Sequence, residues 1–190
     1  TIITEKDIRT KSGFDLRNYP GGALGLPEAR EFFSTILEVS PEETIVGNNA
    51  SLEMLSELFM IFLLHGNRNS SKPWIEYKPL KMIVTVPGYD RHFKLLQTLG
   101  FEMIQVNMTP KGPDIDAIER IVAEDEGVKG ILFVPTYSNP TGDVIADEIV
   151  DRLAAMKTKA ADFTIFGDDA YCIHHIYDNQ KRPKNLLNAC

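Results

Sequence analysis

The chain has 190 residues, of which 43% are hydrophobic and 25% are charged, and its formal net charge is -7. This balance is typical of a soluble globular protein with enough chain for one ordinary domain. The scattered Lys and Arg residues form no basic stripe to neutralise phosphates, and the longest apolar stretch, 58–64, is too short to cross a bilayer, so we expect neither a nucleic-acid partner nor a membrane span.

Short β-rich runs alternate with helical patterns along the chain. Several of the runs are apolar on both faces, as parallel strands covered by helices are. This alternation predicts an α/β fold with a mainly parallel sheet. In chain order we expect a helix at 27–37, a strand at 44–46, a helix at 50–65, a polar surface excursion at 66–79, a strand at 81–86, a helix at 91–99, a strand at 101–106, a helix at 114–124, a strand at 130–134, a helix at 145–159 and a strand at 163–166.

Small, amide, aromatic and acidic residues follow four of the expected strands. In open α/β sheets, ligands bind beyond the carboxyl ends of the strands. We therefore expect a pocket at one rim of the sheet. The segments that would line it are Gly47-Asn48-Asn49, Pro87 to Asp90, Pro135 to Gly142 and Gly167 to Tyr171.

Each of these segments also has a purely structural interpretation. A helix N-terminus after Gly47-Asn48-Asn49 suits a phosphate, but Asn is also a common helix cap. The amide of Asn139 either faces the pocket or only supports its own Asn-Pro-Thr-Gly turn. Asp168 is either a helix or loop cap or the partner of a cationic ring nitrogen, with Tyr171 pointing to the same place. Tyr89 either stacks on a planar ligand or fills a gap at the rim.

Taken in order, Gly-Asn-Asn, Pro-Gly-Tyr-Asp-Arg-His, Asn-Pro-Thr-Gly and Asp-Asp-Ala-Tyr resemble the class I/II aminotransferases of pyridoxal-phosphate (PLP) fold type I. The resemblance covers nearly the whole chain, starting at Asn18-Tyr19 and the segment from Gly25 to Arg30. The sequence of residues 87–92 is similar to that of a bacterial aspartate aminotransferase subgroup. The resemblance implies that residues 1–190 are a three-layer, PLP-binding large domain, incomplete at both ends and without the small domain.

The resemblance also implies a role for each matching residue. A carboxylate beside the pyridine nitrogen favours the protonated ring, which stabilises a carbanion on the substrate. The resemblance makes Asp168 the candidate for this carboxylate and Tyr171 the second candidate catalytic residue. Tyr19 would reach the phosphate of a neighbouring subunit, which implies a homodimer. The remaining implied contacts are phosphate binding by Gly47, Asn48 and Asn49, ring stacking by Tyr89, hydrogen bonds to the phenolic oxygen from Asn139 and Tyr171, and the ion pair of Asp168 with the ring nitrogen.

The reaction that the resemblance implies is transfer of an amino group from an amino acid, with aspartate as the candidate, to a 2-oxo acid. Lys181 and Lys184 lie in an expected solvated loop, and neither fits the context of the family's Schiff-base lysine. Residues 1–190 alone are therefore expected to be inactive. The alternatives are a PLP-dependent lyase or decarboxylase, a non-catalytic PLP-binding sensor domain of a transcription regulator, and an unrelated α/β domain.

The remaining sequence signals are weak. The chain has no signal-peptide pattern and begins with Thr1 rather than Met, which is consistent with a partial sequence. Cys172 and Cys190 have no disulfide-scaffold or metal-type spacing, so a cytoplasmic protein with reduced thiols is the simplest interpretation. Adjacent histidines such as His174-His175 point apart, and we expect no metal site.

Overall fold

The computed structural model describes residues 3–17, 22–47 and 49–190. The chain divides into two compact units, Thr1–Asn49 and Ala50–Cys190. No helix in the described ranges is long and apolar enough to span a membrane.

The first unit is built around α1 (Pro27–Leu37), which begins with proline at its first turn, where the missing N–H costs no hydrogen bond. Arg30 on this helix donates to the carbonyl oxygens of Thr44, at 2.8 Å, and Pro41, at 2.5 Å. Residues 44–46, which we expected to be a strand, belong to no sheet, although the backbone of Thr44 is extended. Their β-branched residues favour extended backbone, but a strand also needs a neighbouring strand to pair with.

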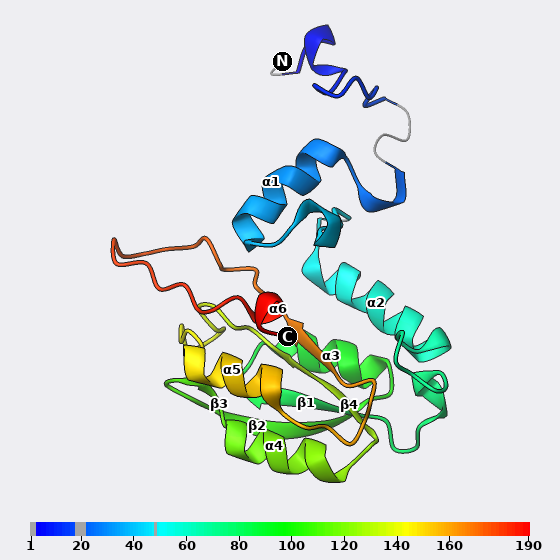
Figure 1. Cartoon of the computed structure of the whole chain (residues 1–190), viewed down its shortest axis with the longest axis vertical. Helices are drawn as coiled ribbons and strands as arrows, with labels where there is room; N and C mark the ends of the chain where they lie inside the picture. The colour runs from blue at the N-terminus through cyan, green and yellow to red at the C-terminus, as the bar shows by residue number, and fades with distance from the viewer. Residues whose placement is uncertain (1–2, 18–21, 48) are drawn as a thin grey trace. The chain divides into compact units, whose positions relative to one another are not determined.

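The second unit contains a five-stranded sheet with the order β3-β2-β1-β4-β5 (Figure 1). All neighbouring strands are parallel except β3, which is antiparallel to β2. The expectation of a mainly parallel sheet is thus confirmed. The strands are β1 (Lys81–Val86), β2 (Glu102–Thr109), β3 (Gly112–Pro113), β4 (Val128–Phe133) and β5 (Thr164–Gly167).

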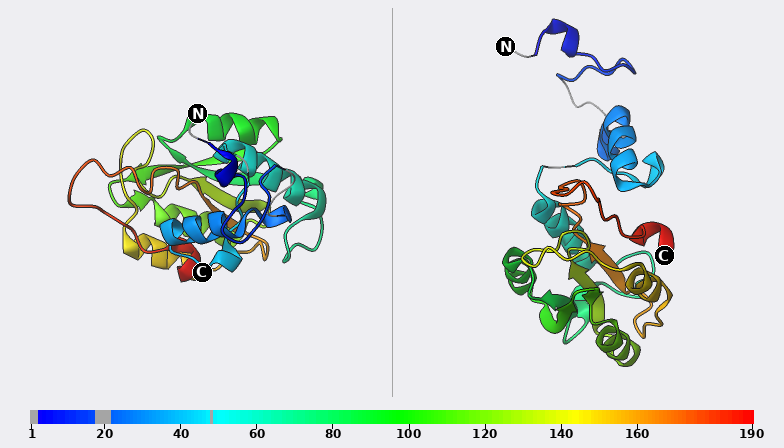
Figure 2. Two further views of the ribbon diagram at one scale, coloured as in Figure 1. Left: turned by 90° about the horizontal axis from the view of Figure 1, so that it is seen from above. Right: turned by 90° about the vertical axis from the view of Figure 1, so that its left-hand side faces the viewer.

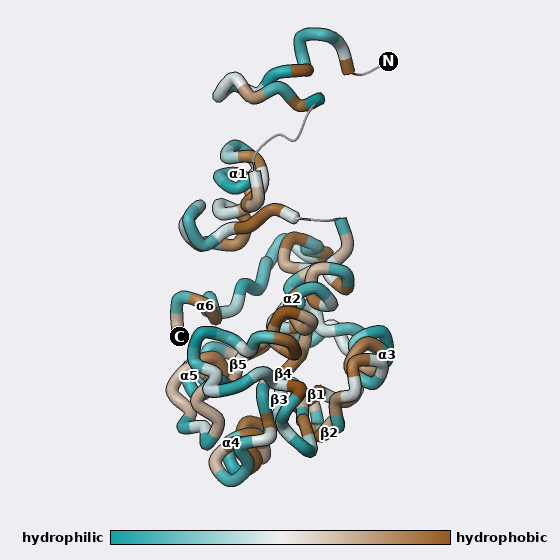
Figure 3. Tube along the Cα trace, turned by 90° about the vertical axis from the view of Figure 1, so that its right-hand side faces the viewer, coloured by the Kyte–Doolittle hydropathy of each residue, from teal (hydrophilic) through white to brown (hydrophobic). Residues whose placement is uncertain are grey.

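Helices cover both faces of the sheet, which confirms the three-layer arrangement (Figure 2). Successive residues of a strand point to opposite faces, so Ile83 packs against one helical layer while Met82 and Val84 pack against the other. The hydrophobic stretches in Figure 3 gather in the sheet and in α2. One layer holds α4 (Ile115–Glu124), α5 (Asp147–Ala155) and the short α6 (Leu186–Ala189), and the other holds α2 (Ser51–His65) and α3 (Asp90–Thr98).

Two expectations about this unit need correction. The helix expected at 145–159 ends at Ala155, because Met156 has an extended backbone that cannot continue it. The excursion at 66–79 is not entirely on the surface, since Trp74 is 0% exposed and packs in the core beneath α2. Burial of this one large ring attaches an otherwise polar segment to the domain.

Parallel pairing places the ends of β1, β4 and β5 at the same edge of the sheet. The segments 87–90, 134–142 and 168–171 leave the sheet at that edge. The residues that we expected to line a pocket in this unit therefore arise from three neighbouring strand ends.

Candidate functional site

Asp168 stands directly after β5, and its backbone N–H donates to the carbonyl oxygen of Phe133 at 2.9 Å. Its side chain is only 7% exposed. One carboxylate oxygen, Oδ2, lies 2.9 Å from Nε2 of His92 and accepts a hydrogen bond from the Ser51 hydroxyl at 3.1 Å. His92 comes from α3 and Ser51 from the first turn of α2, so the two helices of one layer hold the same carboxylate.

These contacts determine the charge of the carboxylate. Burial by itself raises the pKa of Asp168, but the hydrogen bond and charge of His92, together with the Ser51 hydroxyl, outweigh burial and hold the pKa below its ordinary value. Burial raises the pKa of the adjacent Asp169, and the negative charge of Asp168 raises it further. The environment thus separates two neighbouring carboxyls and concentrates negative charge on Asp168.

His92 and Ser51 are absent from the site residues expected from sequence. His92 follows Tyr89 by three residues, about one helical turn, so both side chains face the same side of α3. That spacing is the sequence signal that could have indicated His92. In the structure the histidine is only 2% exposed, and a polar group buried to this extent requires a polar partner. Ser51 follows Gly47-Asn48-Asn49 closely, but no sequence pattern pointed to Asp168 as its partner.

Asn139 and Tyr171 are in direct contact. The Asn139 amide, Nδ2, donates to the Tyr171 hydroxyl oxygen at 3.2 Å, which links the loop after β4 to the segment after β5. Because the Tyr171 oxygen accepts this bond, its own O–H proton is free to be donated to another acceptor. The amide has a second N–H, so the pair offers two donors suited to an anionic oxygen.

Tyr89 lies beside the carboxylate site. It is the N-cap residue of α3, is half-buried, and meets the His92 ring edge-on, with ring centroids 5.1 Å apart at 82°. The tight turn before it depends on Gly88, where an added Cβ would lie 2.3 Å from the carbonyl oxygen of Thr85. Tyr89, His92 and Asp168 therefore form one connected chain of side chains.

The structure describes only some of the predicted phosphate-binding residues. Tyr19 and Asn48 lie outside the described residues. Gly47 and Asn49 are exposed and belong to the first compact unit. Their roles stay predictions.

The chemistry of the described residues fits PLP. A buried, ionised carboxylate suits a protonated pyridine nitrogen, two donors suit an anionic phenolic oxygen, and a half-buried aromatic ring suits a planar ligand. Asp168, the pair Asn139–Tyr171 and Tyr89 provide these three features at one edge of the sheet. No cluster of three or more potential metal ligands occurs in the described part of the chain.

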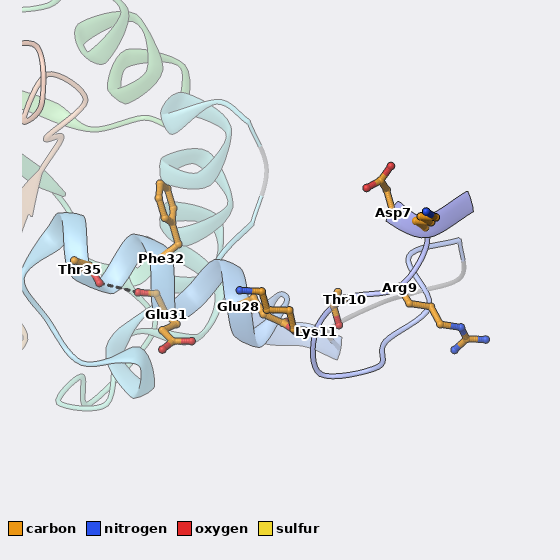
Figure 4. A pocket seen from close by; sticks show the side chains of 9 residues that line it. Asp7, Arg9, Thr10, Lys11, Glu28, Glu31, Phe32 and Thr35 are labelled. Carbon is orange, nitrogen blue, oxygen red and sulfur yellow. Dashed lines mark hydrogen bonds between the residues drawn. The ribbon is translucent and has the colours of Figure 1, made fainter. Parts of the chain in front are cut away.

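A separate hollow lies in the first unit, lined by charged and polar side chains of residues 6–11 and by one face of α1 (Figure 4). Glu28 at its edge accepts hydrogen bonds from the hydroxyl and backbone N–H of Ser12, at 2.6 and 2.8 Å, and these lower its pKa to about 2. Thr35 on the same helix donates to the carbonyl oxygen of Glu31. Among the described residues, none of those expected to bind the cofactor lines this hollow.

Comparisons with known proteins agree with the resemblance drawn from the sequence. The family model described as aspartate amino-transferase matches residues 1–190. An aspartate aminotransferase of Corynebacterium glutamicum is 40% identical over 90% of this chain and 39% of its own length. A protein of Mycolicibacterium smegmatis, named provisionally as an aminotransferase, is 43% identical over 94% of this chain and 42% of its own length.

A solved structure shows the same fold. The crystal structure of an aspartate transaminase from Corynebacterium glutamicum superposes with a TM-score of 0.93 at 36% identity, over 99% of this chain and 44% of that one. The chain thus spans less than half the length of these similar proteins.

Proposed function

Because the chain belongs to the aspartate amino-transferase family, we propose that it forms the cofactor-binding part of a PLP-dependent aminotransferase. The proposed reaction moves an amino group from an amino acid, with aspartate as the first candidate, to a 2-oxo acid. The observation that carries this proposal is the buried carboxylate of Asp168, held by His92 and Ser51 beside the linked pair Asn139–Tyr171. The aspartate aminotransferase of Corynebacterium glutamicum, at 40% identity, supports the choice of substrate.

Each residue would contribute to holding the cofactor. PLP, when bound, supplies an electron sink for the carbanion formed when the substrate loses its α-proton. Asp168 would keep a proton on the ring nitrogen, and His92 and Ser51 would keep Asp168 ionised and fixed in orientation. Asn139 and Tyr171 would donate to the phenolic oxygen, and Tyr89 would stack on the ring.

The remaining parts of the proposal come from the sequence. Gly47, Asn48 and Asn49 would bind the phosphate, and Tyr19 would reach the phosphate of a neighbouring subunit in a homodimer. A cytoplasmic location also stays a prediction, based on cysteine usage.

We also propose that residues 1–190 do not transaminate by themselves. The Lys184 ammonium pairs with Asp151 on α5, and its backbone N–H donates to Asp147 at 2.8 Å. Lys181 is exposed in the same loop. Neither lysine fits the context of the family's Schiff-base lysine, so the covalent anchor and proton-moving base would have to come from elsewhere in the protein.

The test is a coupled assay of oxaloacetate formation from aspartate and 2-oxoglutarate. The samples are the full-length protein, its Asp168→Asn variant, the same substitution at the exposed Asp178 as a control, and residues 1–190 alone. We expect turnover by the full-length protein and the Asp178→Asn variant, a loss of about a hundredfold or more for Asp168→Asn, and none for residues 1–190.

Three results would contradict parts of this proposal. Unchanged turnover by Asp168→Asn would remove the role given to that carboxylate. Turnover by residues 1–190 would show that the base lies within them. PLP binding by the full-length protein without transfer from any amino acid would favour the lyase or sensor alternatives.

A further inference from the structure

Two side-chain contacts between the loop after β4 and the segment after β5 lie close to the cofactor donors. The first link is the bond from Asn139 to the Tyr171 hydroxyl. The second joins the Tyr137 hydroxyl to Nδ1 of His175 at 2.8 Å, with the two rings edge-on and their centroids 5.8 Å apart. His175 is half-buried, although its neighbour Ile176 is 87% exposed. His175 is therefore less exposed than the residues on either side of it.

The backbone of Tyr137 explains why the second link matters. Its φ is +52°, a left-handed conformation that is unfavourable for a residue with a Cβ. Such a conformation persists only where surrounding contacts hold it. On either side, Thr136 and Ser138 are buried, and the Ser138 N–H donates to the carbonyl oxygen of Asp143 at 2.8 Å. A further contact comes from outside the loop, because the Tyr137 hydroxyl is hydrogen-bonded to His175 in the segment after β5.

The position of Asn139 depends on this conformation. Only Ser138 separates Asn139 from Tyr137, so a rotation of the backbone at 137 changes the direction in which the Asn139 amide is presented. A displacement of about 1 Å at a site of this kind can reduce activity by roughly a hundredfold. The Tyr137–His175 contact is thus well placed to control the donor that the proposed function assigns to the phenolic oxygen.

We propose that His175 is a positioning residue of the cofactor site, which through Nδ1 holds the Tyr137 hydroxyl and so fixes the 137–139 segment that presents the Asn139 amide. This inference rests on the proposed function. His175 acts through Tyr137 and touches neither the cofactor nor the substrate. Its second ring nitrogen, Nε2, is buried with no hydrogen-bond partner among the described residues, so the imidazole reaches Tyr137 through Nδ1.

The two ring nitrogens can be separated by substitution. In His175→Asn, the amide occupies approximately the place of Nδ1, whereas in His175→Gln it reaches approximately the place of Nε2. Tyr137→Phe removes only the hydroxyl of the contact. Tyr177→Phe is the matched control, because Tyr177 lies on the same segment and is 79% exposed.

The experiment uses the full-length, PLP-loaded protein. The readouts are the dissociation constant of PLP, the pH midpoint of the cofactor's visible absorbance, kcat and KM, with thermal unfolding by circular dichroism to confirm folding. Tyr137→Phe and His175→Gln should weaken PLP binding about tenfold. They should also raise the absorbance midpoint, because a misplaced Asn139 no longer stabilises the anionic oxygen. His175→Asn and Tyr177→Phe should behave like the unmodified protein.

Two outcomes would overturn the inference alone: a Tyr137→Phe variant with unchanged PLP affinity and midpoint, or a His175→Gln variant that keeps both while His175→Asn loses them. The second outcome would transfer the role to Nε2. Failure of the unmodified full-length protein to bind PLP would overturn the proposed function and this inference together, which distinguishes the two failures.

Discussion

A buried ion pair lies at the sheet edge opposite to the candidate site. Lys129, near the start of β4, places Nζ 2.7 Å from Oδ1 of Asp162, and the two side chains are 1% and 4% exposed. The other oxygen, Oδ2, accepts hydrogen bonds from the Ser70 hydroxyl at 2.7 Å and from Nε1 of Trp74 at 2.9 Å. Nζ also lies 3.3 Å from the centroid of the Tyr77 ring. This network attaches the 66–79 excursion to the sheet.

Asp162→Asn should strongly destabilise the fold. The substitution preserves shape and one acceptor, but it leaves the Lys129 ammonium buried without its counter-charge. Removing one partner of a buried pair costs about 3–5 kcal/mol. The contact with the Tyr77 ring remains and is worth up to about 2 kcal/mol when desolvated, so we expect a loss near the lower end, about 3 kcal/mol. The double substitution with Lys129→Met should recover part of the loss, because no uncompensated charge then stays buried.

The stabilisation should depend on pH. Burial raises the pKa of Asp162, but the Lys129 ion pair and the hydrogen bonds from Ser70 and Trp74 outweigh burial and hold the pKa below its ordinary value. A carboxyl with a lowered pKa stabilises the fold fully above its unfolded pKa of about 4. That contribution is lost as the pH falls through the lower folded value. The difference between Asp162→Asn and the unmodified protein should therefore shrink in acid.

The assay is urea unfolding of the full-length protein at pH 7, followed by circular dichroism. The control is Glu148→Gln, which breaks the pair Lys111–Glu148, also short at 2.6 Å but with side chains 70% and 58% exposed. Exposed pairs contribute little, so the control should leave the urea midpoint essentially unchanged. A loss below about 1 kcal/mol for Asp162→Asn, or one equal to that of the control, would refute the reasoning.

Two further predictions concern the candidate site. His92→Phe should raise the pKa of Asp168, because burial remains while the largest stabilising contact of the carboxylate is lost. The acid limb of the pH profile of PLP binding should then move to higher pH. An unchanged acid limb would argue against the His92–Asp168 pair. Gly88→Ala should lower the melting temperature by several degrees, because its Cβ would lie 2.3 Å from the Thr85 carbonyl oxygen, whereas Gly167→Ala, with no atom nearer than 3.6 Å, should be tolerated.

Local sequence signals predicted most elements of the second unit. The apolar run of β1 and the helical pattern of α2 appear within one residue of their expected bounds. The elements of this unit that were not predicted are β3 (Gly112–Pro113), α6 (Leu186–Ala189) and the 3-10 helix Trp74–Glu76. All three are short, and β3 exists only through its pairing with Met108 and Thr109. Elements this short have no periodicity, so only their neighbours in space define them.

The sequence by itself predicted an α/β fold with a mainly parallel sheet, because strand and helix periodicity and turn composition are local properties. The family and the three-layer domain came from the resemblance of the ordered motifs to the aminotransferases. It also placed Asp168, Asn139 and Tyr89 after strands, and parallel strands bring such residues to one edge. Only the tertiary structure decided which side chains meet there. His92 and Asp168 are 76 residues apart, and Ser51 and Asp168 are 117 apart. Tyr137 and His175, and Lys129 and Asp162, are also distant in the sequence and meet only in the folded protein. Such contacts depend on how helices and loops pack around the sheet, and no local pattern of residues records that packing.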